Sequence, residues 1–191
     1  MKLILASASP RRAELLRAAG FDFEIAAAEI DERVRDGEAP EAYVRRLAME
    51  KAARVAAAHD RDVVVLGADT TVVVDGEILG KPSNDDEASK MLSRLAGRWH
   101  EVLTGVSLRS GTREAGGVTT TRVQFAPLTP AEIAWHVTSG DGRDKAGAYA
   151  IQGLASRFIP AIDGSYTNVV GLPVALVQQL LKRFETRYSE Q

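Results

Sequence analysis

The chain has 191 residues, of which 45% are hydrophobic and 26% charged, with a net charge of −2 and no cysteine. This composition suits a globular protein with a real core, and it excludes disulfides and thiolate metal sites. The near-neutral charge gives no general attraction to nucleic acid or membranes, so any anion site must be local. No apolar run approaches the roughly 20 residues that span a bilayer, and the short apolar start is expected to be a strand, not a signal peptide. The length suits one large domain or two lobes that share a sheet. We expect a cytoplasmic protein and a single domain, 1–191.

The first helix is expected at 10–19, after a strand at 2–6 and a loop of small residues. Ser9 is a suitable N-cap, Pro10 suits the first helical position, and Gly20 ends the helix. Arg11 and Arg12 lie in the first turn, where the helix dipole disfavours cations. They are either solvated surface residues or, as we favour, part of a phosphate site at the helix N-terminus.

A longer helix is expected at 40–59, after a short strand at 21–27. Its apolar face carries Lys51 near the middle, where a lysine does not easily reach solvent. Lys51 should therefore have an anionic partner, either a carboxylate or a ligand phosphate. The loop between strand and helix contains Glu29, Asp31 and Glu32. Such acidic clusters are usually solvated, but they can also supply the oxygen ligands that Mg²⁺ prefers.

An apolar strand at 63–74 is interrupted by a carboxylate, Asp69. Burying that charge costs several kcal/mol unless it is paired or bound to a metal. Asp69 is therefore either a structural residue held by backbone N–H groups or a lysine, or a functional one. Asp75-Gly76 predicts a hairpin to a return strand at 77–79. Lys81 follows, but the surrounding residues do not fit the spacing of a P-loop.

The rest of the chain mixes further strands and helices, which predicts an α/β fold with a mixed sheet. A capping box begins one of these helices. The histidines have no metal-type spacing and are expected to be structural or surface residues. The segment 144–153 is too irregular for a clear assignment. We expect helices at 84–95, 129–140 and 173–184, strands at 100–108, 118–125, 157–162 and 166–170, a loop at 110–117 and a hairpin turn at 163–164.

The chain has five cationic residues at positions where solvation does not readily explain the charge, together with four carboxylates. This combination suits a polyphosphate with a divalent metal: cations hold phosphates, carboxylates hold the metal, and one carboxylate orients or deprotonates water. With no catalytic cysteine and no Ser–His–Asp arrangement, the pattern favours hydrolysis of a phosphoanhydride without a covalent intermediate. It does not identify the bond or the nucleotide. The cations are Arg11, Arg12, Lys51, Lys81 and Lys145, and the carboxylates are Glu29, Asp31, Glu32 and Asp69.

Several motifs together resemble those of the Maf family, nucleoside triphosphate pyrophosphatases once described as septum-formation inhibitors. They occur in order from the first strand to the last helix, and their combination is specific. The matching segments are SASPRRAELL (7–16), YVRRLAMEKA (43–52), GADT (67–70), GKP (80–82), HEVLTGV (100–106), DKAGAYAIQG (144–153) and GSYTNVVGLP (164–173).

The resemblance implies a long mixed sheet with flanking helices and two lobes around a cleft, related to the inosine triphosphatase (Maf/Ham1) fold. It implies cleavage between the α and β phosphates with a divalent cation, Mg²⁺, Mn²⁺ or Co²⁺, and Asp69 as proton acceptor. Homodimerisation is a hypothesis that rests on the resemblance alone. The expected site comprises catalytic Asp69, Lys51 and Lys81, substrate-binding Ser7, Arg11, Arg12, Thr70, Lys145 and Gln152, and metal ligands Glu32 and Asp69.

The segment 144–153 resembles the subgroup that acts on dTTP and UTP. A sister subgroup that acts on 7-methyl-GTP has Glu where this chain has Gln152. A Gln side chain both donates to and accepts from a pyrimidine's imide edge, whereas an ionised Glu only accepts. The leading hypothesis is a house-cleaning enzyme for dTTP, UTP and modified pyrimidine nucleotides. The alternatives are a 7-methyl-GTP pyrophosphatase, a nucleotide-sensing regulator of cell division without turnover, and a pure interaction protein.

Overall fold

The computed structural model of the chain describes residues 2–60 and 62–186. Its contacts divide the chain into two compact units. Unit 1 comprises Met1–Asp69, Thr104–Thr119 and Gly171–Gln191, and unit 2 comprises Thr70–Leu103 and Thr120–Val170. One boundary between the units therefore falls between Asp69 and Thr70, two neighbouring residues that the sequence prediction assigns to the same site. The single domain over 1–191 and the cleft between two lobes stay predictions.

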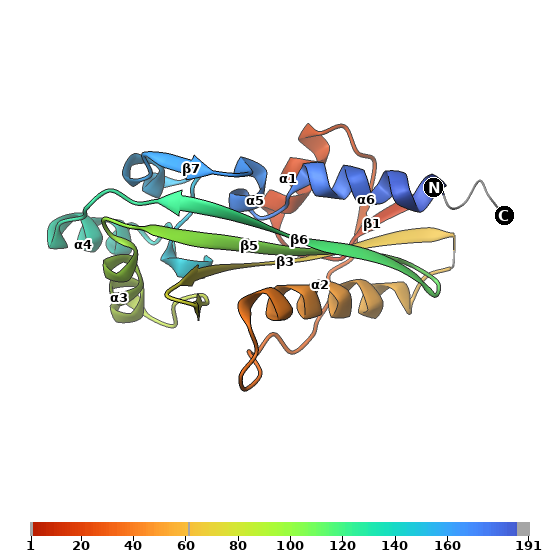
Figure 1. Ribbon diagram of the computed structural model, residues 1–191, viewed down its shortest axis with the longest axis horizontal. Helices are drawn as coiled ribbons and strands as arrows, with labels where there is room; N and C mark the ends of the chain where they lie inside the picture. Colours follow the sequence, from red (N-terminus) through yellow and green to blue (C-terminus); the bar gives the residue numbers. More distant parts are fainter. Residues whose placement is uncertain (1, 61, 187–191) are drawn as a thin grey trace. The chain divides into compact units, whose positions relative to one another are not determined.

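The described residues form a seven-stranded sheet with the order β2-β1-β3-β5-β6-β7, and β4 pairs with β3 (Figure 1). Strand β1 is parallel to β2 and β3, whereas β4 and β7 run antiparallel to β3 and β6. The mixed α/β sheet predicted from the sequence is thus confirmed. The strands are β1 Lys2–Leu5, β2 Glu24–Ile25, β3 Val63–Val74, β4 Glu77–Leu79, β5 Trp99–Ser110, β6 Arg113–Gln124 and β7 Ala161–Asp163.

The helices begin and end largely where the sequence signals predict. Asn84 caps α3 by accepting from the Glu87 N–H, and the predicted capping box of α4 is present, with Gly140 left-handed after its end. The helices are α1 Pro10–Ala18, α2 Pro40–Ala56, α3 Asp85–Leu95, α4 Pro130–Ser139, α5 Tyr166–Val170 and α6 Val174–Thr186, with 3₁₀ turns η1 Ala146–Ala148 and η2 Leu154–Phe158.

Unit 1 has helices on both faces of its strands, with α1 and α6 on one side and α2 on the other (Figure 1). Alternate residues of a strand face opposite sides. Leu5 and Leu66 accordingly pack in the core with α1 and α6, whereas Ile4 and Val65 pack in the core with α2. Burial on both faces explains why the first half of β3 is a nearly continuous apolar run.

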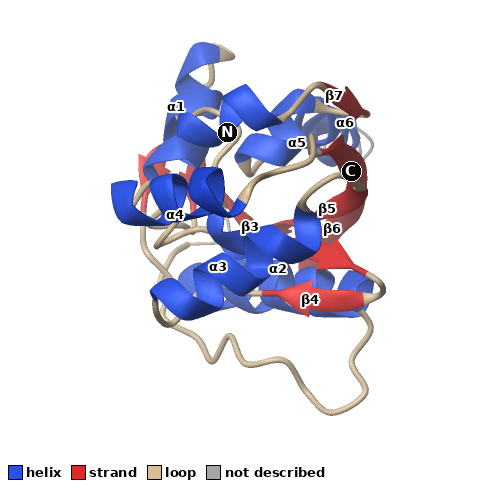
Figure 2. Ribbon diagram, turned by 90° about the vertical axis from the view of Figure 1, so that its left-hand side faces the viewer, coloured by secondary structure: helices blue, strands red, loops and turns tan. Residues whose placement is uncertain are grey.

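Unit 2 has a core of its own beside the second half of β3. The apolar face of α3, which includes Met91 and Leu92, packs there with Val72 and Phe125. Helix α3 also contacts α4 and the 3₁₀ turn η1, and Figure 2 shows α3 and α4. Gly147 in η1 has a positive φ of 69°, and a Cβ at this position would lie only 3.0 Å from the Val72 side chain. Glycine therefore allows the irregular segment after α4 to approach β3 closely.

The predicted strand at 166–170 is wrong, because this segment forms helix α5. The Ser165 hydroxyl accepts from the Asn168 N–H at 3.2 Å, and the buried Asn168 amide donates to the Val102 carbonyl and the Thr121 hydroxyl. These tertiary contacts outweigh the strand preference of Tyr, Thr and Val. The predicted turn at 163–164 is therefore not a hairpin.

Three other boundaries also differ from the sequence prediction. The strand predicted at 157–162 is a 3₁₀ turn followed by β7, because Pro160 has no N–H for a ladder. The strand predicted at 21–27 pairs only over Glu24–Ile25, beside the four-residue β1. The loop predicted at 110–117 is a tight turn between β5 and β6. Gly116 lies within β6, where a Cβ would come to 2.6 Å from the Val106 carbonyl oxygen.

Candidate functional site

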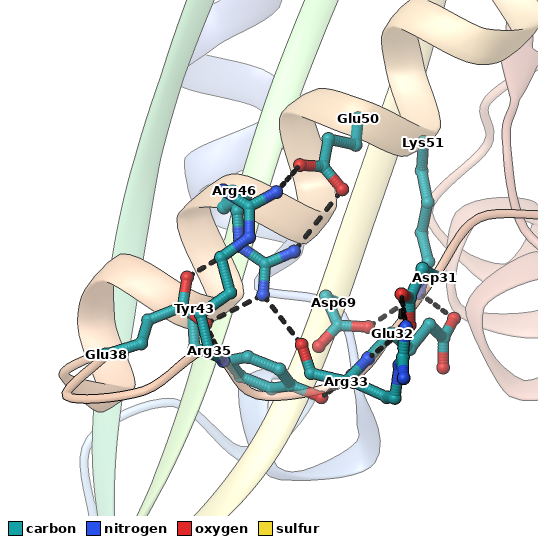
Figure 3. Close-up of polar contacts among 10 residues, drawn as sticks. All are labelled: Asp31, Glu32, Arg33, Arg35, Glu38, Tyr43, Arg46, Glu50, Lys51 and Asp69. Carbon is teal, nitrogen blue, oxygen red and sulfur yellow. Dashed lines mark hydrogen bonds and ion pairs between the residues drawn. The ribbon is translucent and has the colours of Figure 1, made fainter.

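Lys51 lies between two carboxylates in unit 1. Its Nζ is 2.6 Å from Oδ1 of Asp69 and 2.7 Å from Oε1 of Glu32 (Figure 3). The Lys51 and Asp69 side chains are only 8% and 10% exposed, whereas the Glu32 side chain is 50% exposed. The anionic partner predicted for Lys51 is thus a pair of carboxylates, one buried and one reaching solvent.

Two glycines allow helix α2 to lie directly against the strands. A Cβ at Gly67 would lie 2.1 Å from the Ala48 carbonyl oxygen, and one at Gly105 would lie 2.2 Å from the Val44 carbonyl oxygen. Neither position tolerates a side chain unless the helix moves. Asp69 shares the strand face of Gly67, two residues away, so the close approach of α2 brings Lys51 to Asp69.

Arg12 is a second buried cation of unit 1, on the first turn of α1. Its Nε donates to the Gly171 carbonyl at 2.9 Å, and its Nη1 donates to the Ser7 hydroxyl at 3.1 Å. Burial lowers the pKa of Arg12, and the charges of Asp69 and Glu32 oppose that shift. Arg11 beside it is half-buried. The residues Arg12, Glu32, Lys51 and Asp69 are called the charged centre below.

The charge of Asp69 is costly in this environment. Burial raises the pKa of its carboxyl, and the nearby Lys51 and Arg12 only partly counteract that shift. A carboxylate with a raised pKa binds a proton more readily than an exposed one, which suits a group that takes a proton from water. A perturbed pKa together with specific charged partners is typical of functional sites.

The remaining predicted site residues belong to unit 2. Thr70 follows Asp69 in β3 and is half-buried, while Lys81 and Gln152 are exposed. Lys145 is 17% exposed and forms an ion pair with Asp144. The Gly147 N–H donates to the Gly80 carbonyl at 3.0 Å, which holds together the two segments that carry the lysines. That these residues approach the same ligand as the charged centre stays a prediction.

Two of the three histidines, His100 and His136, are buried in the structure, and His59 is exposed, which agrees with the prediction of structural or surface residues. The Nε2 of buried His100 lies 2.7 Å from the Tyr149 hydroxyl, and the Nε2 of buried His136 lies 3.1 Å from the Ala148 carbonyl oxygen. Among the described residues, no group of three or more His, Cys, Asp or Glu side chains is placed to hold a metal. No helix within the same residues is long and apolar enough to cross a bilayer.

The sequence reasoning missed the side chains that hold the acidic loop against α2. By helical spacing alone, Tyr43 falls on the apolar face of this helix and Arg46 on its polar side. In the structure Tyr43 donates to the Glu32 carbonyl, and Arg46 contacts both Glu38 and the Arg33 carbonyl. Every residue has a backbone carbonyl, so the sequence does not indicate which carbonyls accept these hydrogen bonds. The only available signal was the helical spacing of Tyr43, Arg46 and Glu50.

These features place the chain in an α/β class with a charged, partly buried centre beside a mixed sheet. Residues 2–184 match the family described as Maf-like protein, and the chain belongs to the Maf family. It is 53% identical to the dTTP/UTP pyrophosphatase of Hahella chejuensis, covering 96% of this chain and 92% of that protein. It is 51% identical to the dTTP/UTP pyrophosphatase of Symbiobacterium thermophilum, covering 96% and 94%.

Among solved structures, the chain is similar to the Ham1 protein of Staphylococcus aureus with a TM-score of 0.43. That match has 14% sequence identity and covers 66% of this chain and 72% of that one.

Proposed function

We propose that this chain is a nucleoside triphosphate pyrophosphatase that hydrolyses dTTP and UTP to the nucleoside monophosphate and pyrophosphate. Relatives with about half of their residues identical to this chain, and aligned over nearly its full length, bear that activity in their names. The observation that carries the proposal is the position of Lys51 between Asp69 and Glu32 in a mostly buried setting. Fixed charges in such a site suit a highly charged substrate and a water molecule that must lose a proton.

In the proposed reaction, Asp69 accepts a proton from the attacking water. The water oxygen forms a bond to the α phosphorus, the bond from the α phosphorus to the bridging oxygen breaks, and pyrophosphate leaves with that oxygen. Burial of Asp69 and its raised pKa support its role as the base. Lys51 fixes the orientation of the carboxylate and stabilises negative charge as it develops.

The phosphates are held by cations and small polar groups. In unit 1 these are Ser7, Arg11 and Arg12, and in unit 2 they are Lys81 and Lys145. Arg12 is already oriented by the Ser7 hydroxyl and the Gly171 carbonyl, so it loses little freedom when a ligand binds. The nucleobase of the substrate is recognised by Thr70 and Gln152, because a Gln amide both donates and accepts hydrogen bonds.

A divalent cation, Mg²⁺, Mn²⁺ or Co²⁺, is part of the proposal. Mg²⁺ is commonly held by one or two carboxylates together with substrate phosphates, not by a cage of protein ligands. The carboxylates of Glu32 and Asp69, both at the Lys51 ammonium, fit that donor set. When bound, the ion neutralises phosphate charge and favours departure of pyrophosphate.

A panel of dTTP, UTP, CTP and 7-methyl-GTP tests the proposal. Pyrophosphate release is measured with Mg²⁺, Mn²⁺ or Co²⁺. We expect the highest kcat/KM for dTTP and UTP, with pyrophosphate as the product and not orthophosphate. A preference for 7-methyl-GTP contradicts the subgroup, and binding without turnover supports the regulator instead.

The role of Asp69 is tested with Asp69→Asn, which keeps the shape of the side chain and removes its basicity. We expect pyrophosphate release to fall by roughly 10²- to 10⁴-fold, the range for loss of a general base, while nucleotide binding by calorimetry survives. Asp75→Asn is the matched control, because Asp75 lies in an exposed turn and pairs with Arg98. Full activity of Asp69→Asn contradicts the assignment.

Location in the cytoplasm and homodimerisation belong to the same proposal. The location rests on the composition and on the short apolar start of the chain, and the dimer rests on the family resemblance. Sedimentation velocity over a range of concentrations, with and without dTTP, tests the dimer: we expect a mass near twice that of the chain, and a single monomer species at every concentration contradicts it.

A further inference from the structure

The loop that carries Glu32 has no regular secondary structure. Residues 26–39 lie between β2 and α2 without forming helix or strand. A segment of this length without its own ladder of backbone hydrogen bonds is usually either functional or disordered. Several polar side chains of α2 contact it, among them Tyr43, Arg46 and Lys51 (Figure 3).

Arg46 makes several polar contacts with this loop. Its Nε donates to Oε1 of Glu38 at 2.6 Å and its Nη2 to Oε2 at 2.7 Å, a two-pronged ion pair. The side chains of Arg46 and Glu38 are only 13% and 9% exposed. Nη2 also donates to the Arg33 carbonyl at 3.1 Å, and Nη1 reaches Glu50, which pairs with Arg35. One guanidinium thus fixes both a side chain and a backbone carbonyl of the loop.

Tyr43 contacts the loop at the residue whose carboxylate meets Lys51. Its hydroxyl donates to the Glu32 carbonyl at 3.0 Å. The Arg46 guanidinium lies over the Tyr43 ring at 5.7 Å from the centroid, so the two side chains support each other. Burial, with the nearby charges of Asp69 and Glu32, raises the pKa of Tyr43 to about 12, so the hydroxyl remains a donor at ordinary pH.

The two hydrogen bonds to consecutive carbonyls, at Glu32 and Arg33, determine where the backbone of residue 32 lies. The Glu32 side chain itself is half-exposed, and without a fixed backbone its flexible chain would pay an entropic cost to reach Lys51. We propose that Tyr43 and Arg46 are positioning residues that hold the Glu32 carboxylate at Lys51 and thereby complete, with Asp69, the site for the divalent cation. This inference rests on the proposed function.

The test is a double-mutant cycle that uses Mn²⁺ as the probe. Mn²⁺ binding is measured from the electron paramagnetic resonance signal of the free ion, in the presence of a dTTP analogue with a methylene group between the α and β phosphorus atoms. Activity with dTTP is measured at the same Mn²⁺ concentrations. The variants are Tyr43→Phe, Arg46→Lys and Glu32→Gln, each alone, and the first two combined with Glu32→Gln.

Tyr43→Phe keeps the ring and removes only the hydroxyl. We expect its Kd for Mn²⁺ to rise roughly 3- to 10-fold, the range for one hydrogen bond. Arg46→Lys keeps the charge and loses the two-pronged geometry, so we expect a rise of about 10-fold. In the Glu32→Gln background both effects should shrink to less than about 2-fold, because residues that act through a shared partner are not additive.

Arg45→Lys is the matched control for Arg46→Lys. Arg45 is the adjacent residue, and it forms an exposed pair with Glu41 one turn away. We expect wild-type Mn²⁺ affinity for this variant. Thermal unfolding of every variant separates a loss of stability, which a purely structural role predicts, from a loss of Mn²⁺ affinity at temperatures where the protein is folded.

The experiment distinguishes failure of this inference from failure of the proposed function. A wild-type chain that binds Mn²⁺ but hydrolyses neither dTTP nor UTP overturns the proposed function, while the binding cycle still decides the inference. The inference is overturned when Tyr43→Phe binds Mn²⁺ like the wild type, when its effect persists fully in the Glu32→Gln background, or when the wild type binds no Mn²⁺.

Discussion

Unit 1 and unit 2 each bury polar side chains, but their chemistry differs. Unit 1 has the charged centre, in which Lys51 and Asp69 are both nearly buried. Unit 2 buries a neutral pair, His100 and Tyr149, and the rings of His100 and Phe125 each pack edge-on with the Tyr149 ring. Charges cost far more to bury than neutral hydrogen-bonding groups, even when they are paired.

Burial shifts the pKa of His100 in the neutral pair and the pKa of Asp69 in the charged centre in opposite directions. Burial lowers the pKa of His100 to about 4, so the folded state holds this ring neutral. Burial raises the pKa of Asp69. Acidification therefore penalises folding through His100, whereas it relieves part of the burial cost of Asp69. The neutral pair is suited to stabilise a core, whereas the charged centre retains a cost of burial, which is consistent with the proposed function.

The largest expected effect is that of breaking the charged centre with Lys51→Met. This change leaves the Asp69 carboxylate buried without its nearest cation, which costs about 3–5 kcal/mol of unfolding free energy. The deficit relative to wild type should be smaller at pH 5 than at pH 8, because the carboxyl can then be protonated. Urea unfolding at both pH values measures it. Lys90→Met, at an exposed position of α3, is the control, and an equal deficit at both pH values contradicts the explanation.

The contribution of the neutral pair to stability is tested by measuring the unfolding free energy as the pH is lowered. The folded pKa of His100 lies below its ordinary value of 6.5, so its contribution to stability is complete above pH 6.5 and is lost as pH falls towards 4. The loss amounts to about 3 kcal/mol when the titration is complete. His100→Gln has no such titration, so the difference between wild type and variant should change over this range. Parallel pH profiles of the two proteins would contradict the prediction.

The packing that supports the charged centre is tested with Gly67→Ala. The added Cβ meets the backbone of α2, so either the helix or the strand must move, at a cost of about 2–3 kcal/mol. Activity should fall with stability, because Lys51 moves with the helix. Gly80→Ala is the control, since a Cβ there has no neighbour within 4 Å. Equal thermal stability of the two variants would show that α2 does not lie as close as described.

The smallest effect is expected for Tyr149→Phe in the neutral pair. The change removes a hydroxyl and leaves the Nε2 of His100 without its partner, at a cost of about 1 kcal/mol. The Nδ1 of the same ring has no hydrogen-bond partner among the described residues, so the ring tolerates one unsatisfied nitrogen already. Calorimetric unfolding measures the change. A loss of unfolding free energy as large as that of Lys51→Met would contradict the expected difference between the neutral pair and the charged centre.

The sequence predicted those features that depend on local patterns. The cap residues, the apolar period of α2 and the Asp75-Gly76 turn fixed most element boundaries, and Lys51 on an apolar face correctly predicted an anionic partner. The predictions for 166–170 and 110–117 were wrong because tertiary contacts decided both segments: buried Asn168 favours a helix, and Gly116 fits against a neighbouring strand. The identity of the partner of Lys51, two carboxylates at once, also required the fold.

The alternation of side chains along β3 limits where this chain can change in length. Gly67 and Asp69 share the face that meets α2, so insertion or deletion of one residue before them in the strand turns the carboxylate to the other face. The turn between β5 and β6, at Gly111-Thr112, carries no such constraint. Lineages of this protein are therefore expected to gain and lose residues at that turn, and a reporter peptide is best inserted there.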